Sequence, residues 1–111
     1  MDKLQKYRQI IRDLLTEQAH PYRQSQDVEA QIICDTEHDH YQLMYMGWDN
    51  QQRIFSLLLH FDIEDGKIWV QYNGTELAIA QILMEKGVDK SDIVLGFHSP
   101  FKRQFSGYAI A

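Results

Sequence analysis

The stretch from Arg53 to Gly74 reads RIFSLLLHFDIEDGKIWVQYNG, and the rest of the predicted fold is arranged around it. Its first half is a long apolar run, and its second half, Lys67 to Tyr72, is again rich in residues typical of β-strands. Between them stand Glu64, Asp65 and Gly66, a tripeptide typical of a tight turn. Two strand-like runs joined by a short glycine-containing turn predict a β-hairpin.

Two further strands are predicted before this hairpin. Alternating apolar and polar residues indicate half-buried strands over Val28–Asp35 and His40–Trp48. Short turns between four successive strands favour an antiparallel meander from Val28 to Asn73. We expect one face of this sheet to be apolar throughout its two hairpin strands, through Phe55, Leu57, Leu59, Phe61, Ile63, Ile68, Val70 and Tyr72.

A helix is predicted on each side of the meander in the sequence. Residues 3–18 have apolar side chains at helical spacing, and we expect Pro21 to end this helix and residues 19–27 to form a loop. Thr75 is typical of the N-cap of a second helix over residues 76–86. The prediction is a single α+β domain, residues 1–111, ordered α-β-β-β-β-α. Both helices cover one face of the sheet, and a short strand at residues 93–98 and a turn-rich tail follow.

Composition excludes several classes of protein. The 111 residues suit one domain, and the net charge of −5 argues against a nucleic-acid binder that works through its overall field. The only cysteine is Cys34, so no internal disulfide is possible. The N-terminal sequence lacks the apolar region of a signal peptide, and no apolar run is long enough to span a membrane. We therefore expect a cytoplasmic protein.

The second face of the sheet is unusually apolar for a surface. Both tryptophans are expected there, and an apolar face of this kind is seldom left uncovered. It is covered either by the chain's own residues 93–111 or by another molecule, which is a partner protein or a second copy of the chain. For the second case, the candidate partner interface consists of Met44, Met46, Trp48, Ile54 and Trp69.

Four residues were considered as metal ligands, namely Cys34, His38, His40 and His60. Imidazole and thiolate groups suit zinc, but the CxxC and HExxH spacings typical of zinc sites are absent. The prediction is therefore that these are turn and surface residues, with neither a metal nor a cofactor.

Candidate catalytic groups are equally sparse. Asp62 and Glu64 precede Lys67 in an order that resembles a magnesium-dependent nuclease, but the spacing from Glu64 to Lys67 is one residue too long. His98 has no serine or cysteine nucleophile beside it in any motif. We predict that the protein is not an enzyme.

Several distinctive motifs are spread along essentially the whole chain. They include the opening MDKLQKYRQIIRDLLTE, the tripeptide Gly47-Trp48-Asp49, and the final YAIA. The longest are HFDIEDGKIWVQYNGTELAIAQIL, which starts at His60, and KSDIVLGFHSPFKRQF, which starts at Lys90. Together these motifs resemble the XisI family.

The resemblance implies a function that the residues alone do not. XisI proteins are named as controlling factors for excision of the fdxN DNA element in nitrogen-fixing filamentous cyanobacteria. They are usually encoded beside XisH, a protein that looks like an endonuclease-fold protein. The expected function is thus that of a non-enzymatic accessory factor that binds a XisH-like partner. The alternatives are a site-specific DNA-binding factor and a metal-dependent hydrolase. The acidic charge counts against the DNA-binding factor, and the absence of a metal motif counts against the hydrolase.

Overall fold

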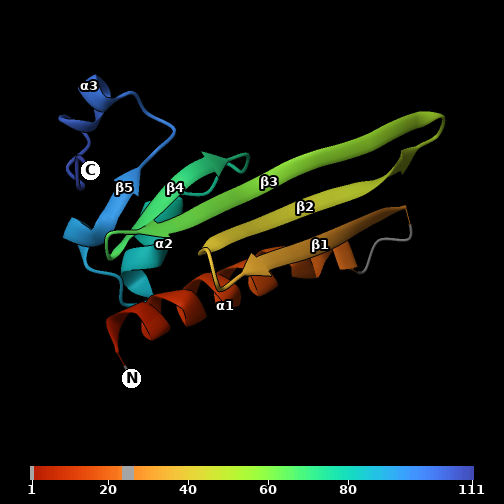
Figure 1. The fold of residues 1–111 in the computed structure, drawn as a ribbon. Helices are drawn as coiled ribbons and strands as arrows, with labels where there is room; N and C mark the ends of the chain where they lie inside the picture. The colour runs from red at the N-terminus through yellow and green to blue at the C-terminus, as the bar shows by residue number, and fades with distance from the viewer. Residues whose placement is uncertain (1, 24–26) are drawn as a thin grey trace.

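The four predicted strands form one sheet, which a short fifth strand completes (Figure 1). The computed structural model describes residues 2–23 and 27–111. Strands β1 (Val28–Asp35), β2 (His40–Asp49), β3 (Gln52–Glu64) and β4 (Lys67–Asn73) are antiparallel neighbours in chain order. Strand β5 (Ile93–Leu95) pairs in parallel with β4. The α+β meander is confirmed, and the short strand predicted over residues 93–98 is present at its edge as β5, which ends at Leu95.

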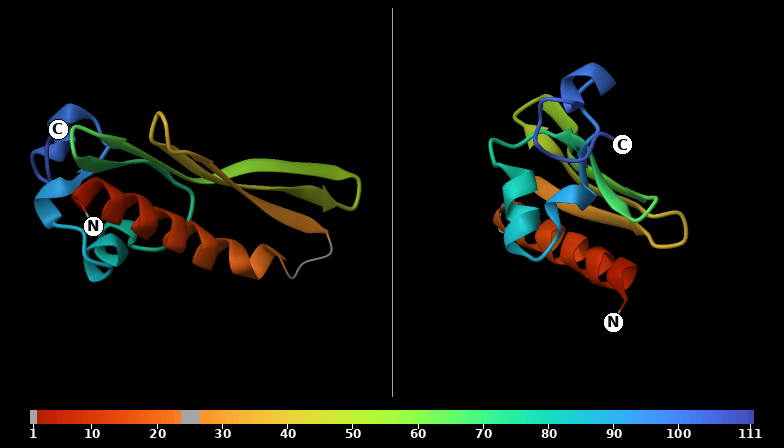
Figure 2. Two further views of the ribbon diagram at one scale, coloured as in Figure 1. Left: turned by 60° about the horizontal axis from the view of Figure 1, so that its bottom comes forward. Right: turned by 90° about the vertical axis from the view of Figure 1, so that its left-hand side faces the viewer.

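The helices lie on opposite sides of this sheet. Helices α1 (Lys3–Arg23) and α2 (Ile79–Glu85) lie below the sheet in the left view of Figure 2, as expected for both long helices. The 3₁₀ turn η1 (Lys90–Asp92) leads into β5. Helix α3 (Pro100–Arg103) and the C-terminus lie on the other side, beside β5. None of the described helices is long and apolar enough to span a membrane.

The core fills the space between the sheet and its two long helices. Helix α1 has a stripe of fully buried residues, and α2 adds Ile79 and Leu83. The sheet contributes apolar residues from β2, β3, β4 and β5. The largest fully buried side chains are Tyr41, Phe61, Ile11, Leu14, Leu15, Leu43, Leu59, Ile68, Leu83 and Ile93.

The bounds of both long helices differ from the predicted ones. Helix α1 continues through Pro21 to Arg23, because a proline near the C-terminal end of a helix removes only one hydrogen bond. The buried Ala19 keeps this part of the helix against the core. The rest of the predicted loop, residues 24–26, lies outside the described residues. Helix α2 begins only at Ile79, because the Thr75 hydroxyl accepts from the Leu77 amide in a turn that precedes the helix.

A β-bulge at Leu58 reverses the faces of the β3 residues that precede it, and the alternation predicted for β3 is therefore wrong there. Leu43 pairs with Leu59, but the next residue, Met44, pairs with Leu57, so Leu58 is an extra residue in β3. Residues directly opposite each other share a face. Leu59, Phe61 and Ile63 therefore face the helices, as Leu43 does, whereas Phe55 and Leu57 lie on the opposite face, which we call the open face.

Two more placements follow from the register. Ile54 pairs with Gly47, between Met46 and Trp48, and it therefore faces the helix side instead of joining Trp48 as predicted. A second bulge, at Gln71, moves Tyr72 to the open face. His60 pairs with Tyr72, while the next residue, Phe61, pairs with Val70. Tyr72, expected inside, is exposed.

Strand β3 has a free edge over half of its length. Its pairing with β2 runs from Gln52 to Asp62, but its pairing with β4 starts only at Leu59. No strand of the described chain pairs with the outer edge of β3 between Gln52 and Leu57. Figure 1 shows this hairpin extending away from β4 and β5. The backbone groups on such an edge are available to another chain.

Candidate functional site

The open face has a group of apolar side chains near the tip of the β2–β3 hairpin. We call Met44, Met46, Trp48, Phe55 and Leu57 the open patch. Trp48 and Phe55 are 54% and 60% exposed, and the other three are half-buried. The Arg53 guanidinium lies 5.3 Å from the Trp48 ring and 5.9 Å from the Phe55 ring, which fits cation–π contact. The result is an apolar surface with one cation beside it.

The chain's own tail covers the other end of the open face, at Trp69. The Arg103 guanidinium lies 5.1 Å from the centre of the Trp69 ring. Arg103 is held there because its Nε donates to the His98 carbonyl at 3.0 Å. Trp69 is half-buried, and its Nε1 is buried without a hydrogen-bond partner among the described residues. The tail thus covers Trp69 and leaves Trp48 exposed.

The five residues of the candidate interface therefore separate into three places. Met44, Met46 and Trp48 lie together in the open patch with Phe55 and Leu57, whose predicted place on the core face is wrong. Trp69 lies under the tail, and Ile54 faces the helix side. The use of these residues as an interface stays a prediction.

Three titratable side chains meet on the open face between the patch and the tail. His40 Nδ1 and His60 Nε2 each lie 2.7 Å from the same oxygen of Asp62, Oδ1. Gln71 Nε2 donates to the other carboxylate oxygen at 3.1 Å, and Gln42 Nε2 lies 2.8 Å from His60 Nδ1. We call His40, His60 and Asp62 the His–Asp–His cluster. Strands β2 and β3 hold it, because His40 and Asp62 are paired across the ladder.

The hydrogen bonds define the charge of the cluster. The bond to Asp62 raises the pKa of His40. Partial burial would raise the pKa of Asp62, but hydrogen bonds from His40, His60 and Gln71 outweigh it and lower that pKa. Asp62 is therefore an ionised acceptor at neutral pH that holds both imidazole rings in place.

The other metal candidates do not join the cluster. Cys34 pairs with Tyr41 and so lies on the helix face, where burial raises the pKa of its thiol. His38 is in the turn after β1, where its Nδ1 lies 2.9 Å from Asp35. Only His40 and His60 meet, and their partner is Asp62, which was considered for nuclease chemistry alone.

The nuclease arrangement is not assembled. Glu64 is exposed at the end of β3 and opposite Lys67. The Lys67 ammonium group donates to the Ala111 carbonyl at 2.7 Å, so it points to the tail. His98 packs its ring on Phe97, with the two ring centres 4.5 Å apart. A nucleophile–base pair of the kind that activates serine or cysteine is not formed at His98 by any described contact.

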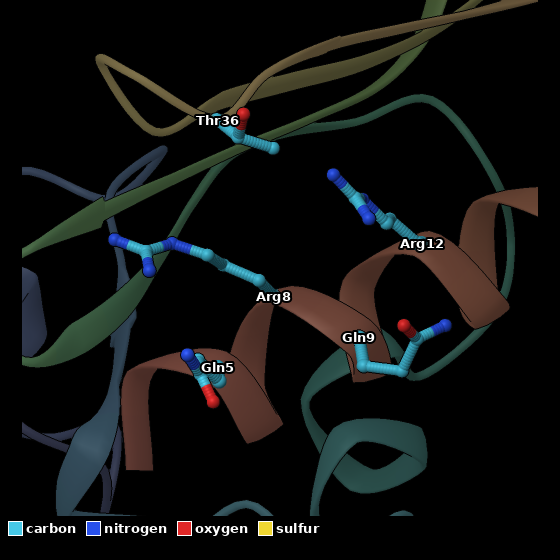
Figure 3. A pocket seen from close by; sticks show the side chains of 5 residues that line it. All are labelled: Gln5, Arg8, Gln9, Arg12 and Thr36. Carbon is cyan, nitrogen blue, oxygen red and sulfur yellow. The ribbon is translucent and has the colours of Figure 1, made fainter. Parts of the chain in front are cut away.

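A polar hollow of about 270 Å³ lies between α1 and the turn after β1. Figure 3 shows Gln5, Arg8, Gln9 and Arg12 on α1, with Thr36 opposite them. Arg8 donates from Nε and Nη2 to the two carboxylate oxygens of Asp39, at 2.8 and 3.0 Å. Because Asp39 neutralises Arg8, the hollow lacks the paired cations that a phosphate site needs.

Comparison with known proteins identifies relatives over the whole chain. The XisI protein family model matches residues 1–110. A crystal structure of a XisI-like protein from Anabaena variabilis ATCC 29413 is 47% identical, covers 97% of this chain and 99% of its own, and superposes with a TM-score of 0.91. The fdxN element excision controlling factor XisI from the same organism is 35% identical, covers 99% of this chain and 100% of its own, and has a TM-score of 0.85. No curated protein matches the chain.

Proposed function

This chain belongs to the XisI family, and from that membership we propose that it is a non-enzymatic controlling factor for excision of a DNA element. It acts in the cytoplasm by binding a second protein, a XisH-like endonuclease-fold partner, and does not itself cut or join DNA. The resemblance of its motifs to the family supports this choice of partner.

The open patch is the observation that carries the proposal. Exposed apolar residues scattered singly are ordinary, but Trp48 and Phe55 lie side by side with the half-buried Met44, Met46 and Leu57. Aromatic residues, methionine and arginine are enriched at the centres of protein interfaces, and Arg53 lies over both rings. The patch therefore has the composition of a docking surface.

The free edge of β3 supports the same conclusion. The edge between Gln52 and Leu57 adjoins the open patch, so one partner can contact both. An extended segment added to this edge would gain main-chain hydrogen bonds, while the patch would receive its side chains. The net charge of −5 favours a partner with a basic surface.

The proposal is tested by co-expression of this chain with a XisH-like protein. We expect the two to purify as one complex at micromolar concentration, and we expect Phe55→Lys to abolish co-purification. Met84→Lys is the matched control, because Met84 is also exposed (39%) but lies on α2, on the other side of the sheet. Separate elution of the two wild-type proteins would contradict the proposal, and so would an equal loss of binding in both variants.

Direct DNA binding is not proposed. Three of the cations that would have to contact phosphates are engaged within the protein. Arg8 is paired with Asp39, Arg103 is stacked on Trp69, and Lys86 is paired with Glu17. A phosphate-binding surface needs several clustered free cations, and these contacts together with the net charge of −5 count against one.

A further inference from the structure

We propose that the His–Asp–His cluster is a binding site for a divalent transition-metal ion, with zinc as the best match. His40 Nδ1, His60 Nε2 and Asp62 Oδ1 would be its protein ligands. The three atoms lie within 4.8 Å of one another, and the two nitrogens are each 2.7 Å from the oxygen. The site is independent of the proposed partner binding.

The spacing of the three atoms is close to what a metal ion requires. Zinc lies about 2.0–2.2 Å from imidazole nitrogen and carboxylate oxygen, so its ligand atoms are roughly 3.4 Å apart in a tetrahedral site. Lengthening the two nitrogen–oxygen contacts from 2.7 Å by under about 1 Å makes this room. Rotation of the half-exposed His40 ring lengthens its own contact, and a small change in the side-chain torsions of Asp62 lengthens the contact to His60, so the strands need not move.

Two glutamines already orient the ligands from outside. Gln71 binds Asp62 Oδ2, so the carboxylate keeps Oδ1 turned toward both rings. Gln42 contacts His60 Nδ1 and leaves Nε2 turned toward Asp62. The Gln42 side-chain amide can donate to Nδ1, or accept from it after a flip, and the second arrangement is the one that metal binding needs. Such outer contacts fix the tautomer and the ring orientation of metal-binding histidines.

The strands hold the ligands, and solvent can reach them. His40 is on β2, while His60 and Asp62 are two residues apart on β3 and share a face. The His40 side chain is 56% exposed, so an ion can enter and water can complete its coordination. Two imidazoles and one carboxylate suit zinc and neighbouring transition metals, whereas magnesium and calcium prefer oxygen ligands.

The test is calorimetric titration of the metal-stripped protein with Zn²⁺. We expect one ion bound per chain, with an affinity at least about 10-fold weaker in His40→Ala and in Gln42→Ala. His38→Gln is the matched control, because His38 also contacts an aspartate, Asp35, but no third ligand lies beside this pair among the described residues. The affinity of this variant should equal that of the wild type. Saturating Mg²⁺ should not compete.

A second readout uses Trp69, which pairs with Asp62 across β3 and β4. In a Trp48→Phe background, Co²⁺ should quench Trp69 fluorescence with the same one-to-one saturation, and His40→Ala should shift the half-saturation point to at least about 10-fold higher Co²⁺. His40 is exposed, so this substitution leaves the fold intact. The proposal is overturned by the absence of saturable Zn²⁺ binding, or by binding that His38→Gln weakens and His40→Ala does not.

Discussion

His40 and Asp62 face each other across β2 and β3, with Nδ1 and Oδ1 2.7 Å apart. They are opposite only because of the bulge at Leu58. The ladder starts at the turn, where Asp49 pairs with Gln52, and an unbroken count from there would place His40 opposite Phe61. The extra residue moves Phe61 into the core and brings Asp62 to His40. One bulge thus determines both the packing of β3 and the His–Asp–His cluster.

Truncation of the bulge residue Leu58 should lower the free energy of unfolding far more than truncation of its neighbour Leu57. Leu58 is buried in the core and Leu57 is half-exposed on the open face. We expect Leu58→Ala to lower the free energy of unfolding by about 2–4 kcal/mol and Leu57→Ala by about 1 kcal/mol. Urea unfolding of the two variants measures the difference. Equal losses would mean that Leu58 does not occupy the core.

Removal of the Arg103 side chain should expose Trp69 to water. The guanidinium covers the indole ring at 5.1 Å, and its aliphatic stem adds to the cover. In a Trp48→Phe background we expect Arg103→Ala to shift Trp69 emission to longer wavelength and to increase quenching by acrylamide. Lys102→Ala, at the exposed neighbouring residue, is the control and should change neither. An unchanged spectrum in Arg103→Ala would show that the tail does not cover Trp69.

The pair Arg8–Asp39 should make stability depend on acid pH. Hydrogen bonds from Arg8 lower the pKa of Asp39 below its usual value of about 3.9. A lowered folded-state pKa stabilises the protein above about pH 4, and the stabilisation is lost as the pH falls through the folded-state value. We expect Arg8→Gln to lower the free energy of unfolding at pH 7 and to lower it much less near pH 2. Lys86→Gln, which removes a more exposed ion pair, should cost under about 1 kcal/mol at pH 7. A cost of Arg8→Gln that does not change with pH would contradict this account.

Ionisation of Tyr7 should lower the stability of the protein at alkaline pH. Burial and the hydrogen bond to Asp92 Oδ2, at 2.6 Å, raise the pKa of Tyr7 to about 12. A raised folded-state pKa stabilises the fold below about pH 10, and this contribution is lost as the pH rises toward 12. We expect the wild type to lose more stability than Tyr7→Phe between pH 8 and pH 11 (about 1 kcal/mol) by urea unfolding. A larger loss in the variant would contradict the assignment.

The four strands and both helices were predictable because their signals are local. Alternation over Val28–Asp35 and the turn at Asp65-Gly66 each lie within a few residues. The bulge was not predictable, because Leu57, Leu58 and Leu59 are all apolar and their pattern fits either face. The placements of Phe55 and Ile54 were wrong for that reason, and Tyr72 was misplaced by the second bulge, at Gln71.

Only part of the candidate site could be predicted from the sequence. The two tryptophans and two methionines of the second face stood out, but Phe55 and Leu57 had been assigned to the core. His60 and Asp62 are two residues apart and share a face of any strand, which was an available signal. Their meeting with His40 depends on the register of β2 against β3, and the bulge sets that register.

We propose that the open patch and the free edge of β3 receive a partner. Hydrogen exchange of the backbone amides, measured with and without a saturating XisH-like protein, tests it most directly. We expect the partner to slow exchange within residues 52–57, where β3 has no neighbour on its outer side, and to leave α2 unchanged. Exchange in residues 52–57 that stays the same in the complex would contradict the claim.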